Sequence, residues 1–140
     1  MTIQFHPGQG VVVICDYTGF VAPEMVKRRP VIVICPKIRG RPRLCTVVPL
    51  STTAPNPVMP YHLELELPFA LPHPFTAKTQ WVKGDMVSAV SFERLDLLRV
   101  GKDISGKRLY QTNPVGDEIL KAVHACVLNG IGLQALTKGL

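Results

Sequence analysis

Short apolar runs, each bounded by glycine or proline, alternate along the chain with polar and proline-rich stretches. Residues 10–17 (GVVVICDY) and 30–36 (PVIVICP) are rich in β-branched side chains and have the length of strands buried on both faces. Residues 43–50 (RLCTVVPL) follow an Arg-Gly-Arg-Pro turn, which predicts an antiparallel hairpin with the preceding run. Residues 61–67 (YHLELEL) alternate apolar and polar positions, as a strand with one exposed face does. The proline-rich stretches between these runs are predicted loops.

The pattern becomes less regular in the second half of the chain. Residues 79–90 (TQWVKGDMVSAV) predict a strand that is broken or bent at Gly84. Ser91 is placed to cap a helical turn over residues 91–95. Residues 107–111 (KRLYQ) predict a last short strand.

One amphipathic helix is predicted near the C-terminus. It runs from Pro114 to Asn129, with Thr112 or Asn113 as its N-cap and Gly130 at its end. Five apolar side chains share one face, which is expected to pack against the sheet: Ile119, Leu120, Val123, Cys126 and Val127.

Five or six short strands and one terminal helix indicate a mainly β protein, built as a small, strongly bent antiparallel sheet or barrel. The 140 residues, 46% apolar and 19% charged, suffice for one domain and exclude global disorder. No apolar run approaches the ~20 residues that cross a bilayer, and no secretory signal is visible, so we expect a cytoplasmic location. The four cysteines lack the spacing of a zinc site and are expected to be reduced: Cys15, Cys35, Cys45 and Cys126.

Positive charge is concentrated in one part of the chain. The net charge is +6, yet residues 25–63 hold seven basic residues and no acidic one, which leaves nine basic and ten acidic residues elsewhere. Phosphates are natural partners of such a stretch, because a guanidinium group forms bidentate hydrogen bonds with phosphate oxygens. The release of counterions from a nucleic acid adds to the affinity. We therefore favour a nucleic acid partner, with a solvated basic hairpin as the alternative. The seven residues are Lys27, Arg28, Arg29, Lys37, Arg39, Arg41 and Arg43.

Two local patterns lie at the ends of the predicted hairpin strands. Glu24 and Arg29 precede the second run, either as a surface ion pair or as a base and a cation that face one phosphate. Ser51, Thr52 and Thr53 end the third run, where hydroxyls either cap the next turn or bind a phosphate oxygen.

A third pattern is Lys83-Gly84-Asp85, which fits either a bulge in the strand or a functional carboxylate beside a cation. His62 follows the hydroxyl-rich loop and is therefore placed near the site. No phosphate-binding loop, nucleophile elbow, zinc-protease or dinucleotide motif is present, so no cofactor or metal is expected.

These pieces follow one another in a recognisable order. A Gly-x-[VIL]-[VIL] strand leads through a loop to Glu, then to an Arg-Pro strand, Val-Pro-x-[ST], an Asp, an Arg-Leu turn and an amphipathic helix. In this chain they are residues 10–13, Glu24, residues 29–34 and 48–51, Asp85, residues 94–95 and the helix 114–129. The arrangement resembles the MazF/PemK/Kid family of type II toxin–antitoxin toxins. The resemblance implies an SH3-like, CcdB/PemK-type antiparallel β-barrel with a C-terminal helix, formed by residues 1–140 as a single domain.

The resemblance also implies roles for individual residues. Arg29 would stabilise the pentacoordinate phosphorane, Ser51 would hydrogen-bond the scissile phosphate, and Glu24 would contact RNA or act as a base. Asp85 and Lys83 match positions that have acid and base roles in some members. The RNA-binding residues would be Lys27, Arg28, Arg39, Arg41, Arg43, Thr52, Thr53 and His62.

Three departures from the family pattern leave the acid and the base open. Lys83 stands where those members carry arginine, and Met86 stands where glutamine is frequent. The loop over residues 17–27 lacks the histidine that some members use.

The function implied is a metal-independent, sequence-selective endoribonuclease that needs no cofactor. It would cleave single-stranded mRNA by attack of the ribose 2′-OH, leave a 2′,3′-cyclic phosphate, act as a homodimer and be blocked by a cognate antitoxin. One alternative is a gyrase-directed toxin of the CcdB branch, which the presence of Glu24, Arg29 and Ser51 disfavours. Another is a catalytically inactive relative that binds RNA or protein.

Overall fold

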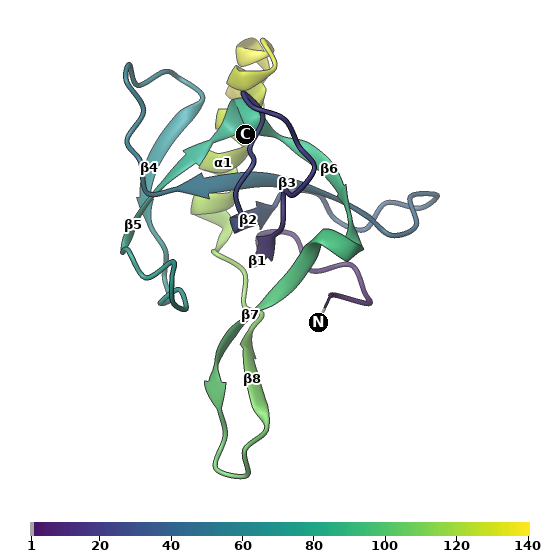
Figure 1. Cartoon of the computed structure of the whole chain (residues 1–140). Helices are drawn as coiled ribbons and strands as arrows, with labels where there is room; N and C mark the ends of the chain where they lie inside the picture. Colours follow the sequence, from purple (N-terminus) through teal and green to yellow (C-terminus); the bar gives the residue numbers. More distant parts are fainter. Residues whose placement is uncertain (1) are drawn as a thin grey trace.

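The computed structural model describes residues 2–140 and confirms a mainly β protein with a helix near its C-terminus (Figure 1). The described strands are β1 (Val12–Cys15), β2 (Arg29–Val33), β3 (Leu44–Ser51), β4 (His62–Glu66), β5 (Thr79–Lys83), β6 (Ser88–Ser91), β7 (Leu95–Lys102) and β8 (Arg108–Gln111). The helix is α1 (Asp117–Gly130), and short 3₁₀ helices are η1 (Gly84–Met86), η2 (Phe92–Arg94) and η3 (Gln134–Gly139).

The strands form one bent antiparallel sheet in the order β4-β5-β3-β2-β1-β7-β8, with β6 paired to β3. The bend lies in β3, because its first half pairs with β6 while Leu50 and Ser51 pair with β5. The predicted hairpin of β2 and β3 is confirmed, with Val31 opposite Pro49. Within residues 2–140 the edge strands β4 and β8 do not pair with each other, so the sheet is strongly bent but open.

The three central strands are buried on both faces, as their β-branched composition predicts. Alternate side chains enter two apolar layers, because successive residues of a strand point to opposite faces of the sheet. One layer contains Val13, Val31 and Val47, and the other contains Val12, Ile32 and Val48. Helix α1 closes the second layer with the predicted apolar face, in which Val123 and Cys126 are buried.

The predicted break at Gly84 is confirmed, since β5 ends there and η1 leads into β6. A Cβ atom on Gly84 would lie 2.6 Å from the backbone carbonyl carbon and oxygen of Cys126. On the helix side, a Cβ atom on Gly130 would lie 2.7 Å from the Cα atom of Asp85. Two glycines therefore let the backbones of η1 and α1 touch, which fixes the chain on both sides of Gly84.

The predicted start of the helix is wrong, because α1 begins at Asp117 rather than at Pro114. The backbone N–H of Val115 donates to the carbonyl oxygen of Gly10 at 2.9 Å, and the Val115 side chain is buried, so this segment is held extended against β1. Gly116 then turns the chain with φ +100° and caps the helix without a side chain, in place of Thr112 or Asn113. Gly130 is the last helical residue, as expected.

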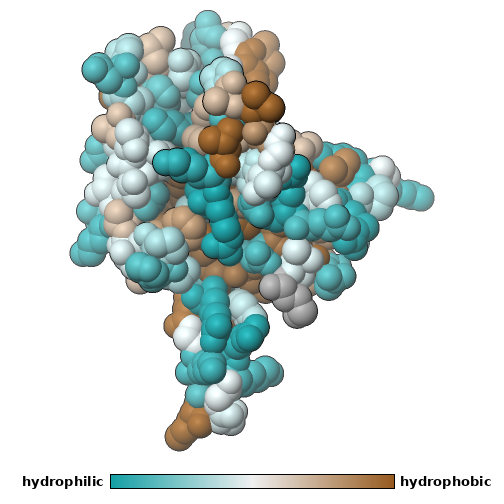
Figure 2. Space-filling model, in the orientation of Figure 1, coloured by the Kyte–Doolittle hydropathy of each residue, from teal (hydrophilic) through white to brown (hydrophobic). Residues whose placement is uncertain are grey.

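Strand β7 is not predicted by the sequence pattern, and neither is η3. The inner half of β7 is paired with β1 and buries Leu95 and Leu98, whereas its outer half is exposed, so the run does not alternate regularly. The outer half and β8 form an arm, which we define as residues 99–111 and which projects from the body of the molecule (Figure 1). Figure 2 shows the arm as a mostly hydrophilic column with an apolar tip, where Ile104 is fully exposed.

The structure also bears on the predicted Ser91 cap, on the cysteines and on membrane-spanning helices. The Ser91 hydroxyl accepts a hydrogen bond from the Glu93 N–H at 3.1 Å and caps η2, as expected. Cys15, Cys45 and Cys126 are buried in the core, as the apolar runs around them indicate. Among residues 2–140, no helix has the length and apolar character that crossing a membrane requires.

Candidate functional site

Strands β2 and β3 bring Arg29 and Ser51 together at the open end of their hairpin. Val31 lies opposite Pro49, and the same register continued by two residues puts Arg29 opposite Ser51. Arg29 begins β2 and Ser51 ends β3, so both side chains stand at the edge of the buried region. Two sequence patterns 22 positions apart are thereby united in one place.

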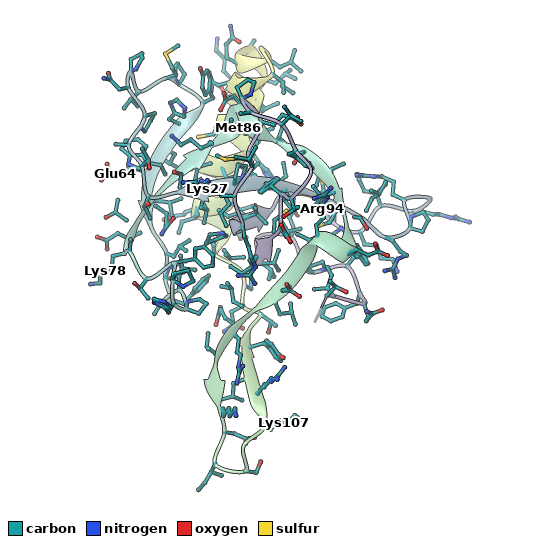
Figure 3. The ribbon with its side chains drawn as sticks, viewed as in Figure 1. Lys27, Glu64, Lys78, Met86, Arg94 and Lys107 are labelled. Atoms are coloured by element: carbon teal, nitrogen blue, oxygen red, sulfur yellow. The ribbon has the colours of Figure 1, made fainter. Side chains whose placement is uncertain are left out.

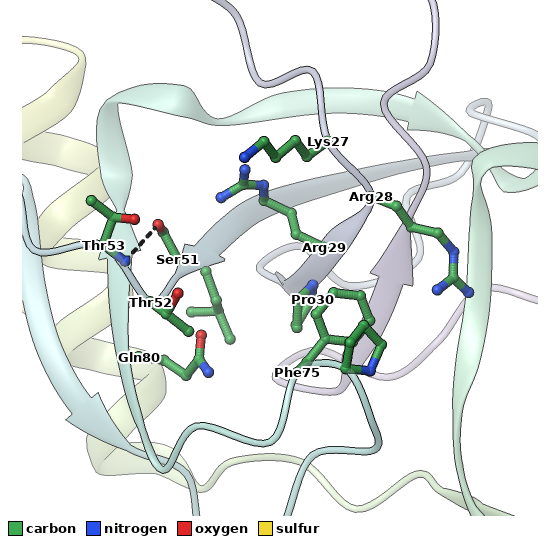
Figure 4. Close-up of a pocket in the computed structure, with 11 residues that line it drawn as sticks. Lys27, Arg28, Arg29, Pro30, Ser51, Thr52, Thr53, Phe75 and Gln80 are labelled. Carbon is green, nitrogen blue, oxygen red and sulfur yellow. Dashed lines mark hydrogen bonds between the residues drawn. The ribbon is translucent and has the colours of Figure 1, made fainter.

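A pocket of about 200 Å³ opens at this end of the hairpin (Figure 4). Lys27 and Arg29 extend their head groups toward the end of the pocket that carries Ser51 and Thr53, whereas Arg28 points away from it. Arg28 instead forms an exposed ion pair with Asp96 at 3.7 Å between Nη2 and Oδ2. The described lining contains three basic residues and no acidic one: Lys27, Arg28, Arg29, Pro30, Leu50, Ser51, Thr52, Thr53, Pro74, Phe75 and Gln80.

The Ser51 side chain is held in a defined orientation. It is only 8% exposed, and its Oγ accepts a hydrogen bond from the Thr53 N–H at 3.1 Å. This is the turn-capping role that hydroxyls after a strand commonly have. Because the hydroxyl accepts from the backbone, its own hydrogen remains available to donate to an anion in the pocket.

Arg29 is a half-buried cation without a matching anion in the pocket. Its Nε is buried and has no hydrogen-bond partner within residues 2–140. Burial lowers the pKa of Arg29, although arginine remains charged at neutral pH. A desolvated guanidinium with an unused donor is a binding group for an anion, because a bound phosphate would supply the missing partner.

Lys83 extends the positive charge of the pocket from β5. Its Nζ donates to the carbonyl oxygen of Thr53 at 3.3 Å, which places the ammonium group at the pocket rim. Burial lowers the pKa of Lys83; Asp85 opposes this shift and Arg29 adds to it. Lys83 therefore interacts with both a carboxylate and the central cation.

His62 lies directly across from Lys83 in the β4–β5 pair. Its Nδ1 accepts from the Met59 N–H at 3.0 Å, which leaves the proton of the neutral ring on Nε2. Burial and the neighbouring Lys83 lower the pKa of His62, and Asp85 opposes them. The structure thus brings His62 next to Lys83, although His62 is not among the described residues that line the Arg29 pocket.

Glu24 and Asp85 line a neighbouring hollow of about 450 Å³. The Glu24 Oε1 accepts from the Val21 N–H at 2.9 Å, so this carboxylate is bound within its own loop and is not among the residues of the Arg29 pocket. The side chains of Tyr17 and Ser88 line the same hollow, where the hydroxyl of each is buried. Burial raises the pKa of Tyr17 well above its ordinary range, so its hydroxyl remains a donor.

The remaining predicted RNA-binding residues lie at the other end of the hairpin. Seven residue steps separate Leu44 from Ser51, roughly 23 Å at the rise of an extended strand, and Arg43 precedes Leu44. The Arg43 guanidinium packs over the Phe92 ring at 5.7 Å, and Arg41 Nη2 donates to Thr46 Oγ1 at 3.1 Å. Arg39, Arg41 and Arg43 are therefore not brought into the pocket, and the basic stretch is divided between two ends of β3.

The sequence patterns do not identify Phe75, Gln80, Tyr17 or Ser88 as parts of a site. Phe75 lies in a proline-rich connection, and Gln80 lies within a strand, so neither belongs to a recognised motif. Gln80 is only 1% exposed, and a buried amide is the signal that would have marked it. That signal exists only once the chain is folded.

Fold and site together define a small β protein with a pocket lined by basic and hydroxyl-bearing side chains. The sequence model of the PemK-like, MazF-like toxins of type II toxin-antitoxin systems matches residues 8–122. YifN of Escherichia coli (strain K12), an uncharacterized protein, is 31% identical over 155 aligned positions, which cover 97% of this chain and 99% of YifN. An uncharacterized protein of Haemophilus influenzae is 32% identical over 108 positions, covering 68% of this chain and 73% of that protein. The chain belongs to the PemK-like, MazF-like toxin family.

Solved structures show the same fold. MazF (form I) from Deinococcus radiodurans matches with a TM-score of 0.61 at 20% identity, over 92% of this chain and 99% of that chain. A mycobacterial endoribonuclease in complex with its cognate antitoxin matches with a TM-score of 0.56 at 19% identity, over 91% of this chain and 96% of that chain. The fold class implied by the resemblance is therefore confirmed.

Proposed function

We propose that this chain is a toxin of a type II toxin–antitoxin system that cleaves single-stranded RNA without a metal ion. The observation that carries the proposal is the pairing of Arg29 with Ser51 in a pocket whose described lining has no acidic residue. Membership of the toxin family makes RNA the preferred polyanion. An endoribonuclease with its cognate antitoxin and a MazE–MazF complex are among the proteins that share the fold.

The scissile phosphate is proposed to lie between Arg29 and Ser51. Charge grows on the phosphorus oxygens when the 2′-oxygen attacks, and a guanidinium that is already desolvated stabilises this charge without reorganising. The Ser51 hydroxyl donates to one of these oxygens, while Lys27 offsets the charge of the neighbouring phosphates. These groups supply the charge stabilisation that a metal ion gives in other nucleases.

Two proton transfers complete the proposed reaction. A base removes the proton of the 2′-OH, the 2′-oxygen forms a bond to phosphorus, and the bond from phosphorus to the 5′-oxygen breaks as an acid protonates that oxygen. Asp85 is our candidate base and Lys83 our candidate acid, because they match positions that have these roles in some family members and because Lys83 Nζ donates to the Thr53 carbonyl oxygen at the pocket. The products are a 2′,3′-cyclic phosphate and a 5′-hydroxyl.

Partners and location follow from the same proposal. We expect a homodimer in the cytoplasm and an antitoxin whose acidic segment covers the Arg29 pocket, since the described lining of the pocket has basic and no acidic side chains. We expect residues 1–140 to act as one domain.

The test is cleavage of a long single-stranded RNA in EDTA by the wild-type protein and by Arg29→Ala. We expect the wild type to produce fragments with 2′,3′-cyclic phosphate ends, a 2′-deoxy strand of the same sequence to stay intact, and Arg29→Ala to lose at least a hundredfold in rate. Arg39→Ala is the matched control, because it removes the same charge from the far end of the hairpin.

Two outcomes contradict the proposal. Intact RNA together with inhibition of gyrase in a supercoiling assay indicates a toxin of the CcdB branch. Tight, salt-sensitive RNA binding without cleavage indicates an inactive relative.

A further inference from the structure

The Arg29 pocket has a second wall that phosphate binding does not use. Pro74 and Phe75 come from the loop between β4 and β5, and Gln80 comes from β5. The loop is tightened by a turn in which the Phe75 N–H donates to the Pro72 carbonyl oxygen at 2.8 Å. An aromatic ring below Pro30 and an amide below Thr52 thus both line the pocket (Figure 4).

Phe75 is positioned by the core but not covered by it. It packs against the apolar layer that contains Leu50 and Val82, and it is half-buried because part of it remains open to the pocket. A ring held in this way loses little freedom when a planar group stacks on it.

Gln80 is a buried polar side chain with unused capacity. Its Nε2 donates to the Ala77 carbonyl oxygen at 3.0 Å, and this is the hydrogen bond that its side chain makes within residues 2–140. The bond fixes which way the amide points, so Oε1 is left as an acceptor at the pocket wall below Thr52 (Figure 4). An acceptor at the wall of a pocket is accessible to a ligand that donates a hydrogen bond to it.

The chemistry of this wall matches a nucleobase. Single-stranded nucleic acids are recognised by stacking of bases on aromatic rings and by hydrogen bonds to their polar edges. The pocket of about 200 Å³ is smaller than the several hundred cubic ångströms of ordinary ligand sites, so it holds one nucleotide unit rather than an oligonucleotide.

We propose that Phe75 and Gln80 form a nucleobase subsite beside the phosphate clamp, with the base stacked on Phe75 and an N–H of its edge donating to Gln80. The subsite deepens the proposed function and rests on it for its role in cleavage. It selects the nucleotide next to the scissile phosphate, so Phe75 and Gln80 determine part of the cleavage sequence.

Phe69 offers a matched control for Phe75. It belongs to the same loop and packs against the same apolar layer, but it lines a different hollow, away from Arg29 and Ser51. Its replacement therefore tests the effect of losing an aromatic side chain from the loop without touching the proposed subsite.

The first experiment maps cleavage sites on a long RNA for the wild type, Phe75→Leu, Gln80→Met and Phe69→Leu, each checked for folding by urea unfolding. We expect Phe75→Leu to lower the rate at preferred sites about tenfold and Gln80→Met to relax the base preference, while Phe69→Leu keeps the wild-type rate and pattern. Folded Phe75→Leu and Gln80→Met proteins with the wild-type rate and pattern would overturn the subsite.

The second experiment separates the subsite from the nuclease activity. Uridine monophosphate and ribose 5-phosphate are titrated into the wild type, Phe75→Leu and Phe69→Leu, and binding is followed at the Gln80 side-chain amide by NMR. We expect the wild type to bind uridine monophosphate about tenfold more tightly than ribose 5-phosphate. Phe75→Leu is expected to remove this difference in affinity, and Phe69→Leu is expected to keep it. Equal affinity of the two ligands for the wild type overturns the subsite, whereas RNA left intact by a protein that prefers uridine monophosphate overturns only the proposed function.

Discussion

Arg29 destabilises the folded chain and at the same time provides a group that can bind a ligand. Its Nε is buried without a partner, and a desolvated donor of this kind destabilises a folded chain. Functional groups are commonly kept at such a cost, because the site needs the group free to meet its ligand. The same residue therefore connects the stability of the protein to the proposed chemistry.

Replacement of Arg29 by methionine separates the two effects. We expect Arg29→Met to keep or raise the free energy of unfolding, by up to about 1 kcal/mol, because the aliphatic side chain fills the space without a buried donor. Arg41→Met is the control, because it removes the hydrogen bond that Arg41 donates to Thr46. We expect this variant to lower the free energy of unfolding by about 0.5–1.5 kcal/mol. Urea unfolding measures both, and a loss above about 1 kcal/mol for Arg29→Met would show that Arg29 supports the fold.

The buried thiols predict a loss of stability at high pH. Burial raises the pKa of Cys45 to about 12 and that of Cys15 to about 11, from an ordinary value of 9.0. The folded state keeps these protons when the unfolded chain releases them, so their contribution is complete below pH 9 and is lost as the pH rises toward the folded values.

We expect the urea midpoint to fall between about pH 8 and about pH 10.5, and to fall less steeply in Cys45→Ala. Cys35→Ala, which changes a partly exposed thiol that adds to the raised pKa of Cys45, is expected to flatten the slope less than Cys45→Ala does. If Cys45→Ala follows the wild-type slope as well, other groups cause the decline.

At the scale of elements, the contact between η1 and α1 decides where Lys83 and Asp85 stand. Gly84 and Gly130 allow two backbones to meet, and a side chain on either would force them apart. The candidate acid and base thus flank a glycine that contacts the helix on one side, while Lys83 is paired with His62 in the sheet on the other.

We expect Gly84→Ala to lower the free energy of unfolding by about 1–3 kcal/mol, because its Cβ would lie 2.6 Å from the Cys126 carbonyl group, which has no flexible end to move. Gly139→Ala is the matched control, since no atom lies within 4 Å of its added Cβ, and we expect a change within about 0.5 kcal/mol. Equal unfolding free energies of the two variants would mean that η1 shifts without cost.

At the scale of the whole molecule, positive charge is spread over three separate places. Lys27 and Arg29 lie at the open end of the β2–β3 hairpin, Arg39 lies at its turn, and the arm carries basic residues of its own, with Lys107 far from Lys27 (Figure 3). Only the first group lines the pocket, so equal charges at these places are expected to contribute unequally to RNA binding.

The salt dependence of RNA binding distinguishes basic residues in the pocket from basic residues at the hairpin turn. With a non-cleavable single-stranded 2′-O-methyl RNA, we expect Lys27→Ala to weaken binding and to reduce the slope of log K against log salt by about 0.7, the value for one phosphate contact on a single strand. Arg39→Ala is expected to leave the slope unchanged. An equal reduction in both variants would show that RNA follows β3 along its whole length.

Much of the fold follows from local patterns in the sequence. β-Branched runs between glycines and prolines predict β1, β2 and β3, and strict alternation predicts β4, because burial on one or both faces leaves a direct mark on composition. The start of α1 and the strand β7 were not predictable in this way. Val115 is tied to Gly10 across the fold, and only half of β7 is buried.

The sequence by itself determined which residue types are present for phosphate chemistry, their order along the chain and the family to which they belong. Charge and hydroxyl groups are visible in a linear sequence, because each is a property of one side chain. The tertiary structure alone decided which of them meet. The register of β2 and β3 joins Arg29 to Ser51, and the length of β3 separates Arg43 from both. Folding also buries Gln80 in the wall of the pocket that Phe75 lines. Proximity and burial are relations between distant parts of a chain, so they arise only when the chain folds.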